Sequence, residues 1–168
     1  MSRAFVKDSD ETVRAEELPE RPQSPHVNYV TPLGLRQLQS RVAALAVRRR
    51  QLVDDENLAS QQELAVVERD LRYYEERVKR AVLVEPENRP RDRVHFGAVV
   101  DVCDDSGEVD RFVIVGEDEA DVAHGKISWV SPLAKALLNA GLGDHVVWRR
   151  PAGDKELEVV GIHPGSSE

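Results

Sequence analysis

Three carboxylates stand side by side at Asp54, Asp55 and Glu56, and Asn57 follows them directly. Carboxylate oxygens are ligands that Mg²⁺ prefers, and a protein often supplies only one or two of them while another partner completes the metal's shell. Asp and Asn also favour turns for conformational reasons, so a solvated loop is the plainer interpretation. The segment is therefore a candidate for metal chemistry shared with a partner, and no stable metal site of its own is expected.

A basic run, Arg48-Arg49-Arg50, precedes the acidic segment and covers nearly one turn of a helix. Two interpretations remain open for it. Cationic side chains near the C-terminal end of a helix interact favourably with the helix dipole and need no partner. Alternatively, clustered guanidinium groups bind carboxylate or phosphate groups, which makes these arginines candidates for contact with an acidic or phosphate-bearing partner.

Two apolar stripes with heptad spacing flank the acidic segment, and they predict an antiparallel coiled-coil hairpin over residues 31–84. Thr31-Pro32 predicts the start of the first helix, and Ser60, three residues before Glu63, predicts a capping box that opens the second. At 1.5 Å per residue the rod is about 35 Å long, with the carboxylates at its far end. The stripes comprise Leu35, Leu38, Val42, Leu45 and Leu52, then Leu64, Val67, Leu71, Tyr74, Val78 and Ala81.

The remaining segments differ in composition. Residues 1–30 are polar, rich in Glu and Pro and without periodicity, which predicts a mostly disordered or extended arm. Prolines and arginines over 85–93 predict a linker. Residues 94–168 contain short strand patterns separated by turn residues, and a helix at 133–139 that follows Ser131-Pro132. This pattern predicts a small α+β domain with an antiparallel sheet packed on one helix.

Composition excludes several classes of protein. The net charge of −8 argues against general binding to nucleic acid or to a membrane surface. Cys103 is the single cysteine, so no intrachain disulfide can form. Apolar runs are too short to span a membrane and the N-terminus lacks a secretory pattern, so a cytoplasmic protein is expected. The chain has no phosphate-binding glycine loop and no nucleophile elbow, which argues against an enzyme with a small-molecule substrate.

Five motifs follow one another along the second domain: FGAVV at 96–100, RFVIVG at 111–116, SPLAKALL at 131–138, GD at 143–144 and PAG at 151–153. Together they resemble the C-terminal domain of the bacterial GreA/GreB transcription elongation factors, with GreB the more similar. The start of the hairpin at 31–35 and its end at 77–81 are also similar to that family. The resemblance implies an FKBP-like fold for residues 94–168.

The same resemblance implies a function in transcription regulation. The second domain would dock at the rim of the RNA polymerase secondary channel, with Ser131 and Pro132 near the contact, and the hairpin would enter the channel. In cleavage-competent relatives the tip carboxylates stabilise a second Mg²⁺ of the polymerase, which then hydrolyses backtracked RNA. The chain would stimulate that activity without being an enzyme itself. DNA or other nucleic acid would be contacted only within the transcription complex.

The sequence departs from the family pattern in three places. The hairpin is about two to three turns shorter per arm, or roughly 10 to 15 Å. When Glu56-Asn57 is aligned with the Glu-Asn of the family's tip motif, Val53 takes the place of its Asp, and Val130 replaces the acidic residue that precedes Ser-Pro. Two alternatives follow: a non-cleaving channel regulator, resembling Rnk or the anti-cleavage Gre homologues, or an FKBP-like peptidyl-prolyl isomerase, for which fold alone is weak support.

Overall fold

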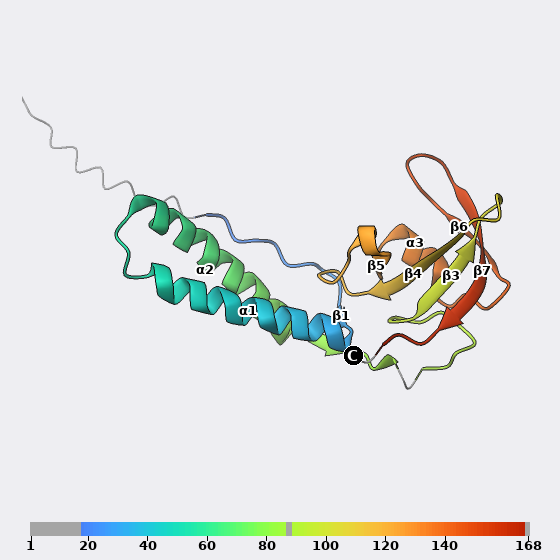
Figure 1. Ribbon diagram of the computed structural model, residues 1–168, viewed down its shortest axis with the longest axis horizontal. Coiled ribbons are helices and arrows are strands. Elements are labelled where there is room, and N and C mark those ends of the chain that lie inside the picture. The colour runs from blue at the N-terminus through green and yellow to red at the C-terminus, as the bar shows by residue number, and fades with distance from the viewer. Residues whose placement is uncertain (1–17, 87–88, 167–168) are drawn as a thin grey trace, which may run out of the picture.

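A helical rod projects from a small sheet domain (Figure 1). The computed structural model describes residues 18–86 and 89–166. The rod is an antiparallel pair of helices, α1 (Pro32–Leu52) and α2 (Leu58–Lys79). With 21 residues in α1, the rod is about 32 Å long. The predicted α+β class and the helical hairpin are confirmed.

The ends of the two helices are fixed by different side chains. At the start of α1 the backbone N–H of Gly34 donates to Thr31 Oγ1 at 3.0 Å, and Pro32 is the first helical residue, as predicted. The predicted capping box at Ser60 is wrong, because α2 begins at Leu58 with Asn57 as its N-cap. Ser60 is already inside the helix, and its hydroxyl donates to the Asp55 carboxylate at 2.8 Å instead of accepting from the backbone.

The seam between the helices is narrow. Leu38, Leu52 and Val67 are its buried apolar residues among those described, while most of the other predicted stripe positions are only half-buried. Ala81 lies outside the helix, in the strand β2 (Ala81–Leu83). A two-helix rod buries too little apolar surface to be stable alone, so its base must be held by other parts of the chain.

The C-terminal domain is a curled five-stranded sheet with one short helix, α3 (Pro132–Leu137), against it. The strand order is β5-β4-β3-β7-β6. The sheet is mixed and not purely antiparallel as expected, because β5 pairs with β4 in parallel. Residues 116–125, which include the 3₁₀ turn η2 (Val122–His124), return the chain to the middle of β4, where Lys126 pairs with Val113 as β5 begins. The strands are β3 (Val99–Cys103), β4 (Val109–Val115), β5 (Lys126–Ser128), β6 (His145–Trp148) and β7 (Lys155–His163).

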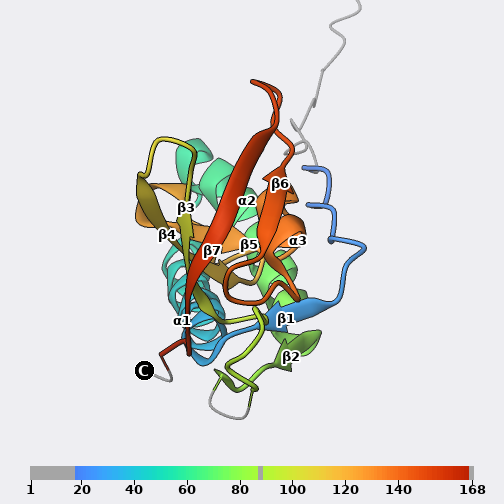
Figure 2. The same cartoon turned by 90° about the vertical axis from the view of Figure 1, so that its right-hand side faces the viewer.

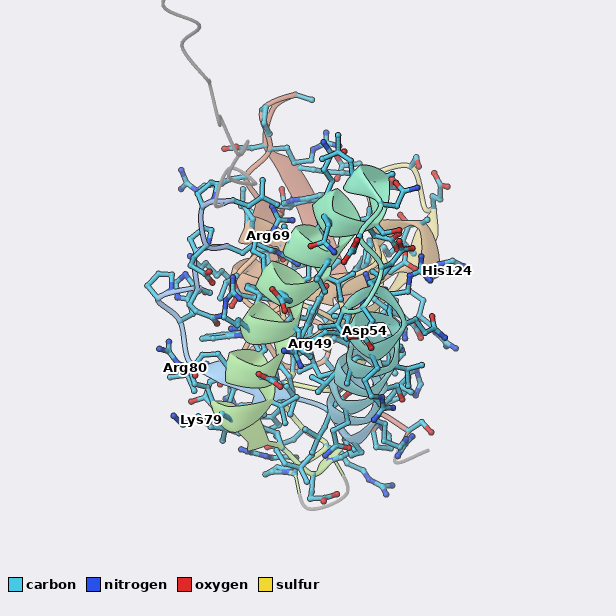
Figure 3. All side chains as sticks on the ribbon, turned by 90° about the vertical axis from the view of Figure 1, so that its left-hand side faces the viewer. Arg49, Asp54, Arg69, Lys79, Arg80 and His124 are labelled. Carbon is cyan, nitrogen blue, oxygen red and sulfur yellow. The ribbon has the colours of Figure 1, made fainter. Side chains whose placement is uncertain are left out.

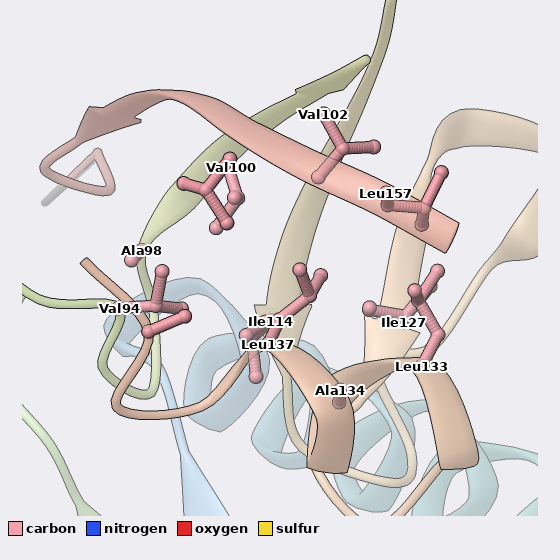
Figure 4. Packing of buried hydrophobic residues seen from close by; sticks show 12 residues of the cluster. Val94, Ala98, Val100, Val102, Ile114, Ile127, Leu133, Ala134, Leu137 and Leu157 are labelled. Carbon is pink, nitrogen blue, oxygen red and sulfur yellow. The ribbon is translucent and has the colours of Figure 1, made fainter. Parts of the chain in front are cut away.

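The core of this domain lies between the sheet and α3 (Figure 4). Alternate residues of β3, Val100 and Val102, point into it, as a strand with one covered face requires. Ile114 of β4 and Leu137 of α3 are fully buried beside them. Each such side chain contributes about 1.5–3 kcal/mol on burial, so this cluster is the main source of stability in the domain.

A second, two-stranded sheet closes the base of the rod. Strand β1 (Asn28–Val30) pairs in parallel with β2, and Figure 2 shows the two strands side by side. The expectation for residues 1–30 was a disordered or extended arm, and residues 28–30 are an extended strand paired with β2. Asn28 is buried, and its amide donates to the Arg77 carbonyl at 2.7 Å. Residues 1–17 lie outside the described residues.

Candidate functional site

Residues 53–57 form the turn at the free end of the rod, between the last residue of α1 and the first of α2. Asp54, Asp55 and Glu56 are all exposed there. Figure 3 looks at the rod from this end, with Asp54 labelled. The hairpin thus places the three predicted carboxylates together, at the point farthest along the rod from the sheet domain (Figure 1).

Asp55 is bound into the turn. Its Oδ1 accepts from the backbone N–H of Asn57 at 2.9 Å, and its Oδ2 accepts from the Ser60 hydroxyl at 2.8 Å. Its backbone carbonyl also accepts from the side-chain amide of Gln61. The Asn57 N–H and the Ser60 hydroxyl lower the pKa of Asp55, because both bonds favour the ionised carboxylate. Asp55 therefore holds the shape of the turn.

Asp54 and Glu56 differ from Asp55. Within the part of the chain that the structure describes, neither side chain has a hydrogen bond or an ion pair. Both carboxylates are accessible to solvent and to any partner that binds at the tip of the rod. No group of three or more His, Cys, Asp or Glu side chains in residues 18–86 and 89–166 is arranged to hold a metal ion.

The three candidate arginines have different environments. Arg48 binds Glu63 across the hairpin, with Nε 2.6 Å from Oε1 and Nη2 2.8 Å from Oε2. Arg49 pairs with Glu68 at 3.1 Å and, as Figure 3 shows, lies between the two helices. Arg48 and Arg49 therefore join α1 to α2, and of the three arginines only Arg50 has no ion pair among the described residues.

Ser131 and Pro132 lie in the sheet domain, away from the tip (Figure 1). Ser131 is the N-cap of α3, and its Oγ accepts from the backbone N–H of Ala134 at 3.3 Å. Pro132 is the first residue of that helix and is exposed. The candidate residues therefore form two groups, one at the tip and one on the sheet domain.

Sequence reasoning missed a buried arginine at the base of the rod. Arg77 of α2 is 1% exposed. Its Nε donates to Asp118 Oδ2 at 2.6 Å and its Nη2 donates to Asn28 Oδ1 at 2.7 Å, while Glu117 Oε2 lies 3.7 Å away. These partners stand 41 and 49 positions from Arg77, so no local pattern could have indicated the contact.

Residues 117–119, here called the acidic loop, bind both helices of the rod. Asp118 accepts from Arg77 and, at 3.2 Å, from the Tyr73 hydroxyl of α2. Glu119 accepts a short hydrogen bond from the hydroxyl of Thr31, the N-cap of α1, and lies 3.7 Å from Lys126 Nζ. The acidic loop is therefore the direct polar connection between the sheet domain and the base of the rod.

Comparison with known proteins agrees with this architecture. Residues 89–164 match the family described as "Transcription elongation factor, GreA/GreB, C-term". Transcription elongation factor GreB of Neisseria meningitidis is 36% identical over 151 residues, which cover 80% of this chain and 93% of that protein. The chain belongs to the GreA/GreB family of transcription elongation factors.

This GreA/GreB chain is also similar to a GreA protein, over a shorter stretch, and to a solved structure. Transcription elongation factor GreA of Pelobacter propionicus is 44% identical over 87 residues, covering 51% of this chain and 55% of that protein. Among solved structures, GreA factor homolog 1 of Thermus thermophilus is 29% identical, with a TM-score of 0.40 over 82% of this chain and 99% of that one. In this GreA/GreB chain, no helix of the described residues is long and apolar enough to cross a membrane.

Proposed function

We propose that this GreA/GreB-family chain binds RNA polymerase, inserts its rod into the secondary channel, and stimulates cleavage of backtracked RNA by the polymerase. The observation that carries the proposal is the tip, where Asp54 and Glu56 are exposed and unpaired at the free end of a rod in a member of this family. The sheet domain would stay at the rim of the channel. The bond-breaking step belongs to the polymerase, so the chain is not itself the enzyme.

The tip residues fit a shared Mg²⁺. Mg²⁺ prefers oxygen ligands and commonly takes one or two carboxylates while other groups complete its octahedral shell. Asp54 and Glu56 offer two such carboxylates with no competing cation among the described residues. Bound jointly with the polymerase, the ion would stabilise negative charge on the reacting phosphate. The part played by this chain is to present the two carboxylates, with Asp55 keeping the turn in shape.

The remaining candidate residues serve docking in this proposal. Pro132 and the Ser131 cap give a rigid exposed corner on the sheet domain, suited to contact at the channel rim. Arg50 is free to meet an acidic or phosphate-bearing surface inside the channel. Nucleic acid would be met only within the transcription complex, since the net charge of −8 disfavours independent DNA binding.

The proposal is tested by transcript cleavage in stalled, backtracked elongation complexes. Replacing Asp54 and Glu56 together by Ala should abolish the stimulation while binding to core polymerase stays unchanged. Glu75→Ala is the matched control, because Glu75 is an exposed carboxylate near the C-terminal end of α2, away from the tip. It should cleave like the unmodified chain. Full cleavage by the Asp54/Glu56 double variant would contradict a role for the tip, and failure to co-elute with polymerase would contradict the proposal as a whole.

A non-cleaving regulator of the same channel is the second candidate. The exposed apolar Val53 and the bound carboxylate of Asp55 favour it, because they leave the turn with only two free carboxylates. The rod of about 32 Å favours it as well, since a tip that stops short cannot ligate a metal. In this case the unmodified chain would stimulate no cleavage, yet would compete with a cleavage-active GreA or GreB for the polymerase.

A further inference from the structure

The described part of the N-terminal arm, residues 18–30, lies along α2 (Figure 1, blue segment). Glu20 pairs with Arg72 at 2.6 Å, and Gln23 Nε2 donates to the backbone carbonyl of Tyr73 at 3.2 Å. The Arg21 guanidinium sits 3.9 Å from the centre of the Tyr73 ring and 3.3 Å from Asp70. Ionic, cation–π and hydrogen-bond contacts thus attach the arm to the rod over more than one turn of α2.

The same arm also contacts the sheet domain. Ser24 Oγ donates to Glu117 Oε1 at 3.0 Å. The rings of His26 and Tyr29 meet Trp129, just beyond β5, edge to face, with centroid separations of 5.9 and 5.0 Å. Aromatic pairs in this geometry attract each other beyond the area that they bury. The arm therefore bridges α2 and the domain through side chains of different chemistry.

The arm approaches the sheet domain so closely at Gly116 that there is no room for a side chain. A Cβ atom added at Gly116 would collide with the backbone carbonyl oxygen of Tyr29. The backbone of Gly116 is not in the left-handed region, so glycine is required here for space and not for conformation. A main-chain atom cannot move aside as a flexible side chain can. Any residue larger than glycine at position 116 must therefore push the arm off the domain.

Without the arm, the rod would be held mainly at one place. The polar bonds of Tyr73, Arg77 and Thr31 to the domain all end on the acidic loop, residues 117–119. Beside this loop, a cleft of about 180 Å³ lies between Leu33 of α1 and the sheet residues Val113 and Val115. Contacts confined to the three residues of the acidic loop would let the rod rotate about that point, so they do not by themselves fix the angle between the rod and the sheet domain. The contacts at Trp129 supply a second point.

We propose that residues 20–29 are a positioning brace that fixes the direction of the rod relative to the sheet domain. The brace is attached to α2 by Glu20, Arg21 and Gln23, and to the domain by Ser24, His26 and Tyr29. Its significance for transcription rests on the proposed function, because the direction of the rod decides where the tip carboxylates are presented. The mechanical role stands on the contacts alone.

The test measures the distance between rod and domain in the full chain. Nitroxide labels go on Leu58→Cys at the tip and Val109→Cys at the start of β4, both exposed, in a Cys103→Ser background. Pulsed electron paramagnetic resonance should give one narrow distribution of label-to-label distances for this doubly labelled chain, the parent of the variants below. Gly116→Ala, and separately the double change Ser24→Ala/His26→Ala, should broaden or shift the distribution. The double change adds no clash, so it remains informative where Gly116→Ala fails to fold.

Gly141→Ala is the matched control. Its backbone is also outside the left-handed region, and a Cβ there would meet neighbours no nearer than 3.5 Å. It should leave the distribution as in the parent. The brace is refuted if Ser24→Ala/His26→Ala keeps the parent's centre and width, or if Gly141→Ala changes them as much.

A cleavage assay on the same variants links the brace to the proposed function. The double change should lower cleavage stimulation on the order of tenfold with polymerase binding retained, because a misplacement of about 1 Å in reacting groups can cost up to 10²-fold. A changed distance distribution with no cleavage by any form, parent included, would support the brace and overturn the proposed cleavage activity. Altered distances with parental cleavage would show that the direction of the rod does not govern the tip.

Discussion

Arg77 at the base of the rod gives the sharpest prediction for stability. Arg77→Met keeps an apolar stem of similar length and removes only the guanidinium. The Asn28 Oδ1 atom then loses its donor inside a residue that is 3% exposed, at a cost of about 1–3 kcal/mol. Asp118 loses a charge-assisted hydrogen bond worth about 1.5–3 kcal/mol, but its side chain is 18% exposed, so water replaces part of it.

A third contribution has the opposite sign. Removing a buried cation also removes the cost of keeping it away from water. The loss at Asn28 is taken as about 2 kcal/mol and the loss at Asp118 as about 1.5 kcal/mol, and the removed cation returns a small part. The free energy of unfolding should therefore fall by about 3 kcal/mol. With a urea m-value of about 1–3 kcal/mol/M, the midpoint should shift by roughly 1–3 M.

Urea unfolding followed by two probes measures this loss. Circular dichroism at 222 nm reports mainly the rod, and tryptophan fluorescence reports the sheet domain, because Trp129 and Trp148 both pack against its core. Separate transitions would reveal that the two parts unfold independently. Arg36→Met is the control, because Arg36 is an exposed arginine of α1 with no ion pair among the described residues. It should change stability by less than about 0.5 kcal/mol. A similarly small change for Arg77→Met would refute the reasoning that the buried contact holds the base of the rod.

Three further changes should have separable effects. Asn57→Ala removes the N-cap of α2 and should cost about 1 kcal/mol, seen as lower thermal stability of the helical signal; no change would mean that Asp55 suffices. Leu137→Ala empties a fully buried site and should cost about 2–5 kcal/mol in urea, whereas a loss below 1 kcal/mol would show that the core collapses to fill it. Arg111 and then His163 lower the pKa of Asp101 to about 2. The stabilisation from Asp101 is therefore present above its unfolded pKa of about 3.9 and is lost as pH falls towards 2. Asp101→Asn should lower the melting temperature at pH 7, and the gap from the unmodified chain should narrow as the pH falls from 4 to 2; a constant gap would contradict this.

Features with a local cause were predictable from the sequence. Thr31 and Pro32 fix the start of α1 because a capping hydroxyl and a proline act within one turn of their own positions. The heptad stripes predicted the hairpin, and the hairpin by itself places Asp54 and Glu56 at the free end of a rod. Ser131-Pro132 likewise predicted the start of α3, which begins at Pro132 with Ser131 as its N-cap.

Features that depend on distant partners were not predictable. Strand β1 is three residues long, too short to show a period, and its partner lies more than 50 positions away. The burial of Arg77 depends on Asn28 and Asp118, which are distant in the sequence. The sequence predicted Ser60 as the cap of α2, but the Ser60 hydroxyl donates to Asp55 and Asn57 caps the helix instead. The parallel pairing of β5 followed from the path of residues 116–125.

The order β1-α1-α2-β2 makes the rod an insertion between two strands that touch each other. Its two ends leave from one spot, so residues added in equal number on both sides of the tip would lengthen it without displacing Asn28, Arg77 or the acidic loop. One extra heptad in each helix would extend the reach by about 10 Å. The length of the rod can therefore change without any change in the contacts that hold its base to the sheet domain.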